Sequence, residues 1–326
     1  MGRKPVRGLM SLLHRLLSRR AIALMLPFGF APWQARAEAT VYRIPPSEAD
    51  PRITRFNVAE NWVFYNRAAS PAAQLLVYLP GSSPTMNGTP LERFQQFFST
   101  ATGAGYHVIA LQYDNHPAVA QICLRVPDPS CAGAVREKRA FGDNATQLID
   151  DTPEESIVNR LTRLLQLLAT RHPDQNWQRY LAGNAPNWPR LVFGGHSQGA
   201  GMAAYIAKRE PLARVVLLSG PEDFSMPGRM VAPWLSMPSA TPADRWFALM
   251  HAQERQAQSL RSAYAALGIP PNHIRVLTLE PAEPPGMGER MDVFHVSVVN
   301  DNLTPRGPGG AAAYRGDWAF LLGHSP

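Results

Sequence analysis

The chain has 326 residues, of which 45 % are hydrophobic and 17 % are charged, so a large core is possible and a disordered protein is excluded. The formal net charge of +7 is concentrated at one end, because residues 1–37 hold seven basic residues and no acidic ones. Without that segment the net charge is about zero, which gives no reason to expect a nucleic-acid partner.

Residues 1–37 have the three parts of a secretory signal peptide: a basic head, an apolar segment over residues 21–30 and a small-residue site at Ala35-Arg36-Ala37. The apolar segment is about half of the ~20 residues that a membrane span needs. We therefore expect cleavage after Ala37, or after Ala39, and an exported protein, periplasmic or secreted, with no integral membrane span. One catalytic domain is expected over residues 38–326.

Apolar runs bounded by turn residues predict strands along the rest of the chain. The first two, residues 40–44 and 62–65, alternate in polarity and predict an antiparallel start to a sheet. The later runs are continuously apolar, as is typical of buried parallel strands: residues 75–79, 106–111, 190–193, 214–218, 246–250 and 274–279.

Helices are predicted between these strands, over residues 91–100, 202–209 and 253–267. A further helix is predicted to begin at Thr152, with Pro153 at its first position and Glu155 completing a capping box. Alternating strands and helices favour an α/β protein, with a mostly parallel central sheet flanked by helices on both faces.

Two cysteines, Cys123 and Cys131, lie on either side of a turn-rich segment. An even number of cysteines in an exported chain predicts a disulfide between them. Two cysteines alone do not complete a tetrahedral metal site, and the sequence has no His-Glu-x-x-His or dinucleotide-binding motif. We therefore expect neither a metal nor a cofactor.

The pentapeptide Gly195-His196-Ser197-Gln198-Gly199 follows a predicted strand and precedes a helix of small residues. This context is typical of a nucleophile elbow, in which the serine sits on a strained turn and two glycines allow close packing. Ser197 is therefore the predicted nucleophile.

With this motif the chain resembles the α/β-hydrolase superfamily over about residues 60–320, and the Gly-His-Ser-Gln-Gly form is similar to that of esterases and lipases. The elbow and the Cys123–Cys131 loop also resemble those of predicted secreted bacterial hydrolases. The resemblance implies an α/β-hydrolase fold and a serine hydrolase.

That fold supplies its triad in the order serine, acid, histidine. His295 follows the last predicted strand and is the expected base, whereas His273 precedes its strand and His324 lies too close to the chain end. Glu254, after strand 246–250, is the expected acid. Asp223, which follows strand 214–218 together with Glu222, is the alternative.

The developing oxyanion needs two backbone N–H donors. Gln198, next to the nucleophile, is one candidate, and Ser82, in the loop after strand 75–79, is the other, with Ser83 as its neighbour. Residues 221–244, which hold Phe224, Met226, Met230, Trp234 and Met237, form either a short lid-like insertion or a surface loop.

The sequence thus predicts a serine hydrolase that cleaves carboxylic esters, of a small molecule or a polymer, through an acyl-enzyme. A non-catalytic binding or envelope protein on the same fold is one alternative, and an acyltransferase or depolymerase with the same triad is another. Neither the acyl-chain length nor the oligomeric state can be read from the sequence.

Overall fold

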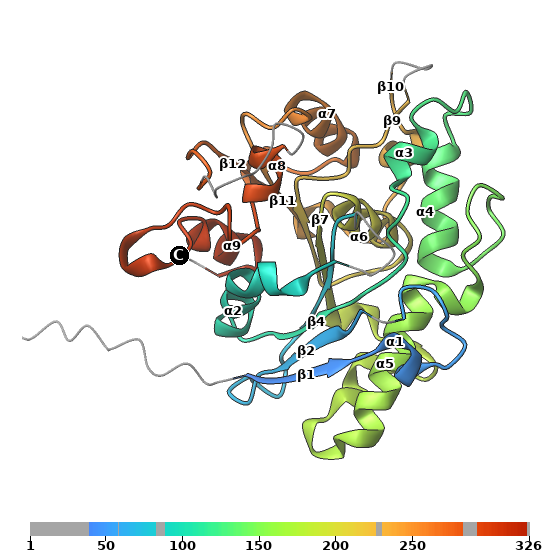
Figure 1. The fold of residues 1–326 in the computed structure, drawn as a ribbon, viewed down its shortest axis with the longest axis vertical. Helices are drawn as coiled ribbons and strands as arrows, with labels where there is room; N and C mark the ends of the chain where they lie inside the picture. Colours follow the sequence, from blue (N-terminus) through green and yellow to red (C-terminus); the bar gives the residue numbers. More distant parts are fainter. Residues whose placement is uncertain (1–38, 58, 83–88, 226–229, 283–291, 325–326) are drawn as a thin grey trace, which may run out of the picture. The chain divides into compact units, whose positions relative to one another are not determined.

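A central sheet of eight strands organises the computed structural model, which describes residues 39–57, 59–82, 89–225, 230–282 and 292–324 (Figure 1). Its spatial order is β1-β2-β4-β3-β7-β8-β11-β12. The strands are β1 (Thr40–Ile44), β2 (Asn61–Tyr65), β3 (Leu75–Leu79), β4 (His107–Ala110), β7 (Leu191–His196), β8 (Arg214–Leu218), β11 (Trp246–His251) and β12 (Ile274–Leu277). The predicted signal peptide, residues 1–37, lies outside the described ranges.

The direction of these strands confirms the predicted mostly parallel sheet. β2 is antiparallel to both β1 and β4, and every other neighbouring pair in the large sheet is parallel. The carboxyl ends of β3, β7, β8 and β11 therefore meet at one edge, where α/β proteins place their binding sites.

Helices cover both faces of the sheet. They are α1 (Pro46–Ala49), α2 (Gln95–Gly103), α3 (Val119–Cys123), α4 (Cys131–Phe141), α5 (Ile157–Arg171), α6 (Gln198–Arg209), α7 (Ala257–Leu267), α8 (Val293–Ser297) and α9 (Arg315–Leu321). Two small hairpins, β5–β6 (Leu181–Ala182 and Ala185–Pro186) and β9–β10 (Phe224–Ser225 and Met230–Val231), complete the strands.

Alternating residues of the central strands build two separate cores. In β3, Leu75, Val77 and Leu79 pack with the apolar faces of α4 to α7, whereas Leu76 and Tyr78 pack with α2 and α9. All five are fully buried, which explains why the strand reads as a continuous apolar run. Figure 1 shows α2 and α9 together, apart from α4, α5 and α6.

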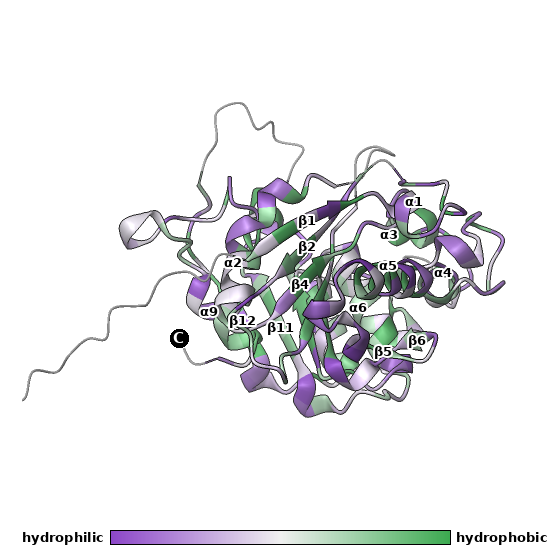
Figure 2. Cartoon of the chain, turned by 90° about the horizontal axis from the view of Figure 1, so that it is seen from below, coloured by the Kyte–Doolittle hydropathy of each residue, from purple (hydrophilic) through white to green (hydrophobic). Residues whose placement is uncertain are grey.

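The long helix α5 begins later than predicted, and its cap is a different residue. Ser156 accepts a hydrogen bond from the Asn159 N–H at 3.2 Å, and Pro153–Glu155 form a separate 3-10 turn whose Thr152 side chain caps nothing. The predicted capping box is therefore wrong. In Figure 2, α5 carries both hydrophobic and hydrophilic residues, as expected for a helix with one buried face.

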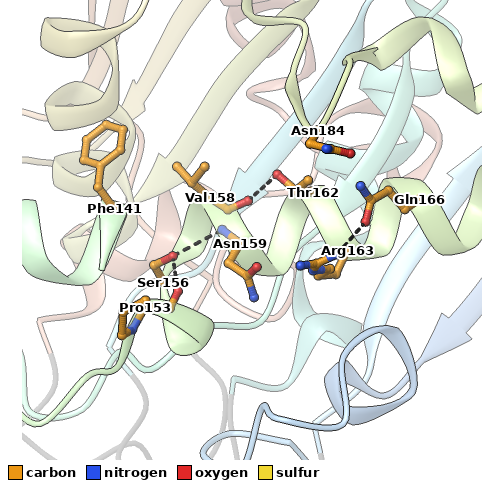
Figure 3. Close-up of a pocket in the computed structure, with 9 residues that line it drawn as sticks. All are labelled: Phe141, Pro153, Ser156, Val158, Asn159, Thr162, Arg163, Gln166 and Asn184. Carbon is orange, nitrogen blue, oxygen red and sulfur yellow. Dashed lines mark hydrogen bonds between the residues drawn. The ribbon is translucent and has the colours of Figure 1, made fainter. Parts of the chain in front are cut away.

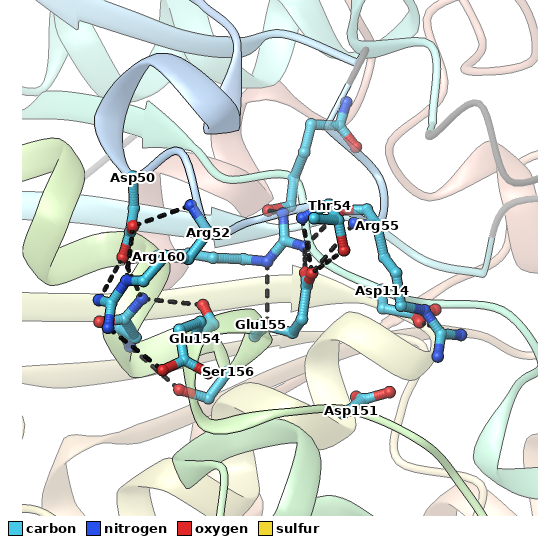
Figure 4. A network of polar contacts seen from close by, with 12 residues as sticks. Asp50, Arg52, Thr54, Arg55, Asp114, Asp151, Glu154, Glu155, Ser156 and Arg160 are labelled. Atoms are coloured by element: carbon cyan, nitrogen blue, oxygen red, sulfur yellow. Dashed lines mark hydrogen bonds and ion pairs between the residues drawn. The ribbon is translucent and has the colours of Figure 1, made fainter.

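The Glu155 side chain belongs to a buried polar network at the start of α5 and therefore does not cap the helix (Figure 4). Its carboxylate accepts hydrogen bonds from the backbone N–H groups of Thr54 and Arg55, at 2.8 and 3.0 Å, and pairs with Arg160. Both partners of that ion pair are about 2 % exposed. The network ties the segment after α1 to α5, and its charges are compensated within it.

The predicted disulfide is present and joins the end of α3 to the start of α4. Cys123 and Cys131 have Cα atoms 5.6 Å apart, and both are buried. The two bonded cysteines are eight positions apart in the sequence.

Replacing both Cys123 and Cys131 with serine is expected to lower the free energy of unfolding by roughly 2–3 kcal/mol, because the unfolded chain regains the freedom that the loop removes. Urea unfolding of the wild type and the double variant measures this difference. Dithiothreitol should destabilise the wild type and leave the variant unchanged. An unchanged unfolding midpoint in the double variant contradicts the prediction.

Candidate active site

Ser197 occupies a strained turn between β7 and α6. Its backbone has φ 55° and ψ −120°, a region that residues with a side chain rarely adopt. The turn is held by a hydrogen bond of 2.8 Å from the Ser197 N–H to the Leu218 carbonyl of the neighbouring strand. This is the geometry that a nucleophile elbow requires.

The two glycines that flank Ser197 are needed for steric reasons. A Cβ on Gly195 would lie 2.5 Å from the Gly199 carbonyl carbon, and a Cβ on Gly199 would lie 2.0 Å from the Leu79 oxygen. No side chain fits at those separations without moving the backbone. The Gly-x-Ser-x-Gly spacing thus lets α6 cross tightly over β3 and β7.

The structure brings Glu254 and His295 together. Glu254 follows the end of β11 and is 3 % exposed. Its Oε1 accepts hydrogen bonds from the Ser219 hydroxyl at 3.0 Å and the His251 N–H at 2.8 Å, and its Oε2 lies 2.7 Å from His295 Nδ1. A carboxylate only accepts, so Nδ1 carries the proton and Nε2 keeps its lone pair.

His295 lies on the short helix α8, and two contacts fix its backbone. Asp292 caps the helix by accepting from the His295 N–H at 3.2 Å and also accepts from the Arg255 N–H at 2.7 Å. His196 Nε2 lies 2.9 Å from the His295 carbonyl oxygen, and the two rings are 4.7 Å apart. Because a carbonyl only accepts, His196 donates from Nε2.

Among the described residues, His295 contacts the residue that precedes Ser197 but is not hydrogen-bonded to Ser197 itself. His196, which contacts His295, directly precedes Ser197, and no hydrogen bond joins Ser197 to His295 within the described part of the chain. Such contacts are often long in the absence of substrate and tighten when substrate binds.

The two histidines of the site differ in their pKa. Burial lowers the pKa of His295, but the Glu254 hydrogen bond and the nearby Glu222 carboxylate outweigh it, so the net shift is upward. Burial, followed by repulsion from His295, lowers the pKa of His196 to about 3. His196 is therefore neutral near pH 7, and His295 is the imidazole suited to gain a proton.

Asp223, the alternative acid, is engaged elsewhere. Its two oxygens accept from Arg136 Nε and Nη2, each at 2.6 Å, and Oδ2 also accepts from the Trp234 indole N–H at 2.7 Å. Both members of the Arg136–Asp223 pair have side chains that are 2 % exposed. No ion pair or hydrogen bond joins Asp223 to His295 in the residues described.

A cavity of about 50 Å³ lies against Ser197, and both predicted oxyanion residues, Ser82 and Gln198, line it. The Gly81 carbonyl accepts from Asn115 Nδ2 at 2.9 Å and from Thr89 Oγ1 at 3.1 Å. Since C=O and N–H point in opposite directions across a trans peptide, the Ser82 N–H points away from these two donors. Ser83 lies outside the described residues.

The N–H of Gln198 is one of the first in α6, and such groups have no acceptor within their own helix. The Gln198 side chain connects the start of α6 to the segment that leads into α3. It donates to the Asn115 carbonyl at 2.8 Å and accepts from the Val119 N–H at 2.7 Å.

Residues 221–244 were expected to form a short lid-like insertion or a surface loop, and within their described part only two acidic residues line the cavity. Glu222 and Asp223 line the cavity, whereas Trp234 is buried against Asp223 and the ring of Tyr205. Phe224 lies on β9, Met230 and Met237 are each 47 % exposed, and Met226 lies outside the described ranges.

The other two C-terminal histidines are held away from this cluster. His273 stacks on Phe247, with Nδ1 3.1 Å from the Trp246 carbonyl at the amino end of β11. His324 packs edge-on against Tyr106. Within the described residues, neither makes a hydrogen bond or ring contact with Ser197, Glu254 or His295.

A larger hollow, of about 350 Å³, runs along α5 (Figure 3). Its lining residues are Phe141, Pro153, Ser156, Val158, Asn159, Thr162, Arg163, Gln166 and Asn184. None of the predicted catalytic side chains is among them, so the candidate site remains the smaller cavity at Ser197.

Three residues of the site were not predicted as such: Glu222, Arg136 and His196. Glu222 Oε1 lies 3.5 Å from His295 Nδ1. The position of Glu222 directly after β8 could have indicated a role at this site, whereas Arg136, on α4, belongs to no recognisable motif.

Across the described residues, no cluster of three His, Cys, Asp or Glu side chains could hold a metal ion, and none of the helices is long and apolar enough to cross a membrane.

No protein-family model and no curated protein matches the sequence. Solved structures with similar backbones include carboxyl esterase 2 from the fungus Tuber melanosporum, at 11 % identity, 90 % coverage of each chain and TM-score 0.46. An esterase of the bacterial hormone-sensitive lipase family has 16 % identity, covers 89 % of this chain and 86 % of its own, and has TM-score 0.41.

A third similar structure is MGS-M1, an α/β hydrolase from a deep-sea metagenome library, at 9 % identity and TM-score 0.41, with 75 % of this chain and 83 % of that chain covered. Such likenesses concern the fold alone. Three features of this chain are those of the α/β-hydrolase fold: the order of the strands, the antiparallel β2 beside the parallel strands, and the place of Ser197 on the turn between β7 and α6.

Proposed function

We propose that this protein is a serine hydrolase that cleaves carboxylic esters, with Ser197 as nucleophile, His295 as base and Glu254 as the acid that orients it. One observation carries the proposal: Glu254 Oε2 lies 2.7 Å from His295 Nδ1, beside the strained turn that presents Ser197. A serine needs an adjacent base to become nucleophilic, and a base needs a third group to fix its tautomer.

In the proposed reaction, His295 Nε2 takes the Ser197 hydroxyl proton while Oγ attacks the ester carbonyl carbon. The N–H groups of Gln198 and Ser82 stabilise the oxyanion of the tetrahedral intermediate. His295 then gives its proton to the leaving alkoxide, which departs as an alcohol and leaves an acyl-enzyme. Water, deprotonated by the same imidazole, releases the acid and restores Ser197.

We also propose that the mature protein is exported. The composition of residues 1–37 supports this, as does the disulfide between Cys123 and Cys131, because such bonds persist in oxidising compartments. Fractionation of cells that express the protein distinguishes a periplasmic protein from a released one.

Turnover of p-nitrophenyl esters of graded chain length tests the activity. We expect hydrolysis, with short acyl chains preferred, since the described cavity at Ser197 is about 50 Å³. A flat response across all chain lengths contradicts the role of this cavity in acyl binding. Absence of turnover on esters, thioesters and amides favours a non-catalytic binding protein on this fold.

The acid limb of the kcat/KM profile reports the pKa of the free base. Activity requires neutral His295, so it is lost as pH falls through a pKa that lies above the ordinary histidine value of about 6.5. Glu254→Gln, which removes the main contribution raising that pKa, should move the limb to lower pH. A limb that stays in place in Glu254→Gln contradicts the assigned contact.

A further inference from the structure

A second carboxylate faces the same imidazole nitrogen as Glu254. Glu222 Oε1 lies 3.5 Å from His295 Nδ1, against 2.7 Å for Glu254 Oε2. The Glu222 oxygen is buried and makes no hydrogen bond to the described residues, whereas Glu254 accepts two further ones. Among the described residues, Glu222 Oε1 is thus a hydrogen-bond acceptor that receives no hydrogen bond and lies close to the Nδ1–H donor of His295.

The surroundings of Glu222 leave its charge available to His295. Its sequence neighbour, Asp223, is paired with Arg136 in a bidentate contact, and the positive charge of the Arg136 guanidinium is therefore compensated by Asp223. Three carboxylates raise the pKa of Glu222 by repulsion: Glu254, Asp223 and Asp292. Of the charged groups that most affect the pKa of Glu222, His295 is the one that lowers it, through the positive charge of its protonated imidazole.

The backbone also holds Glu222 at this place. It follows β8 by a turn in which Ser219 has φ 49° and its hydroxyl donates to Glu254. A Cβ on Gly220 would lie 2.2 Å from the Ser197 carbonyl oxygen. The loop that carries Glu222 is thereby packed directly against the nucleophile turn, and Glu222 lines the cavity at Ser197.

We propose that Glu222 is a second acid for His295: a positioning residue that shares stabilisation of the imidazolium with Glu254 and accepts the Nδ1 proton's hydrogen bond when Glu254 is lost. The inference rests on the proposed hydrolase function. It requires no proton transfer to Glu222, only a change of hydrogen-bond acceptor from Glu254 to an oxygen that lies 3.5 Å from Nδ1. Burial raises the pKa of Glu222, which His295 opposes, so this support weakens in acid.

A double-mutant cycle on the full chain tests the proposal, with kcat/KM for a p-nitrophenyl ester as readout. Losing the orienting acid of a triad costs about 10⁴-fold when nothing replaces it. We expect Glu254→Gln to lose only about 10²-fold, and Glu222→Gln about tenfold or less. The double variant should fall by the full ~10⁴-fold, well beyond the product of the two single effects.

The pH profile separates this role from a structural one. Glu222→Gln should move the acid limb to lower pH, because a carboxylate that raises the pKa of His295 is gone, and Glu222→Asp should restore part of the shift. Glu48→Gln, which removes an exposed carboxylate of α1, is the matched control and should leave the limb in place.

Single effects that multiply to the double effect, with an unmoved acid limb in Glu222→Gln, overturn the second-acid role. Failure of the hydrolase proposal has a different signature, because the wild type then turns over no ester. In that case NMR titration of His295 decides the matter: an unchanged pKa in Glu222→Gln overturns the contact, and a lowered one supports it.

Discussion

Replacing Ser197 with alanine is expected to lower kcat for ester hydrolysis by about 10⁴- to 10⁶-fold, because the remaining groups have no nucleophile to activate. The fold should be retained, since the Ser197 hydroxyl makes no hydrogen bond within the described chain and alanine leaves the Gly195 and Gly199 packing untouched. Steady-state kinetics beside circular dichroism measures both properties.

Ser262→Ala is the matched control for this change. Ser262 lies on the exposed face of α7, where its hydroxyl bonds only a backbone carbonyl one turn earlier. Its kcat should equal that of the wild type. Turnover by Ser197→Ala within tenfold of the wild type would place the nucleophile elsewhere.

Asp223→Ala is expected to lower the free energy of unfolding by about 3–5 kcal/mol, because it leaves the Arg136 guanidinium buried without its counter-ion. The pair is bidentate at 2.6 Å, and both side chains are 2 % exposed. The Arg136 guanidinium packs over Gly201, where an added Cβ would lie 2.3 Å from Nη2.

Urea unfolding of two further variants isolates the cause. Asp150→Ala removes an exposed carboxylate and should change stability by less than about 0.5 kcal/mol. Arg136→Met combined with Asp223→Leu should be much less destabilised than Asp223→Ala, because no charge remains unpaired. Equal losses in the single and double variants would assign the effect to packing and to the lost hydrogen bond of the Trp234 indole N–H, and not to the unpaired charge.

The strands were predictable because both faces of the sheet are covered. β3 and β8 have the predicted bounds, residues 75–79 and 214–218, since their buried positions are all apolar and only the half-buried first residue of β8, Arg214, is charged. The turn at Ser197 was also predictable from the sequence, because only glycine fits sterically at positions 195 and 199.

The helices around the cavity were not predictable in the same way. α4 buries Arg136, Lys138 and Arg139 besides its apolar residues, so basic side chains interrupt its apolar periodicity. α8, which carries His295, has five residues, too few for a periodic pattern. The helix start at Thr152 was misplaced because Glu155 bonds a distant backbone segment.

The choice between two acids depended on long-range contacts. Asp223 and Glu254 both follow strands that end at the same edge of the sheet, and the sequence leaves both open. Asp223 is taken up by Arg136, which lies 87 positions earlier in the chain. Glu254 meets His295 across 41 positions. Neither pairing has a local signal.

Mass spectrometry after reaction with a fluorophosphonate tests the central claim most directly, because only a serine activated by a base reacts with it rapidly. We predict a single adduct on the peptide that contains Ser197 in the wild type, strongly slowed labelling in His295→Ala, and none in Ser197→Ala. An unlabelled wild type, or an adduct on another serine, would contradict the assignment of Ser197 and His295 as nucleophile and base.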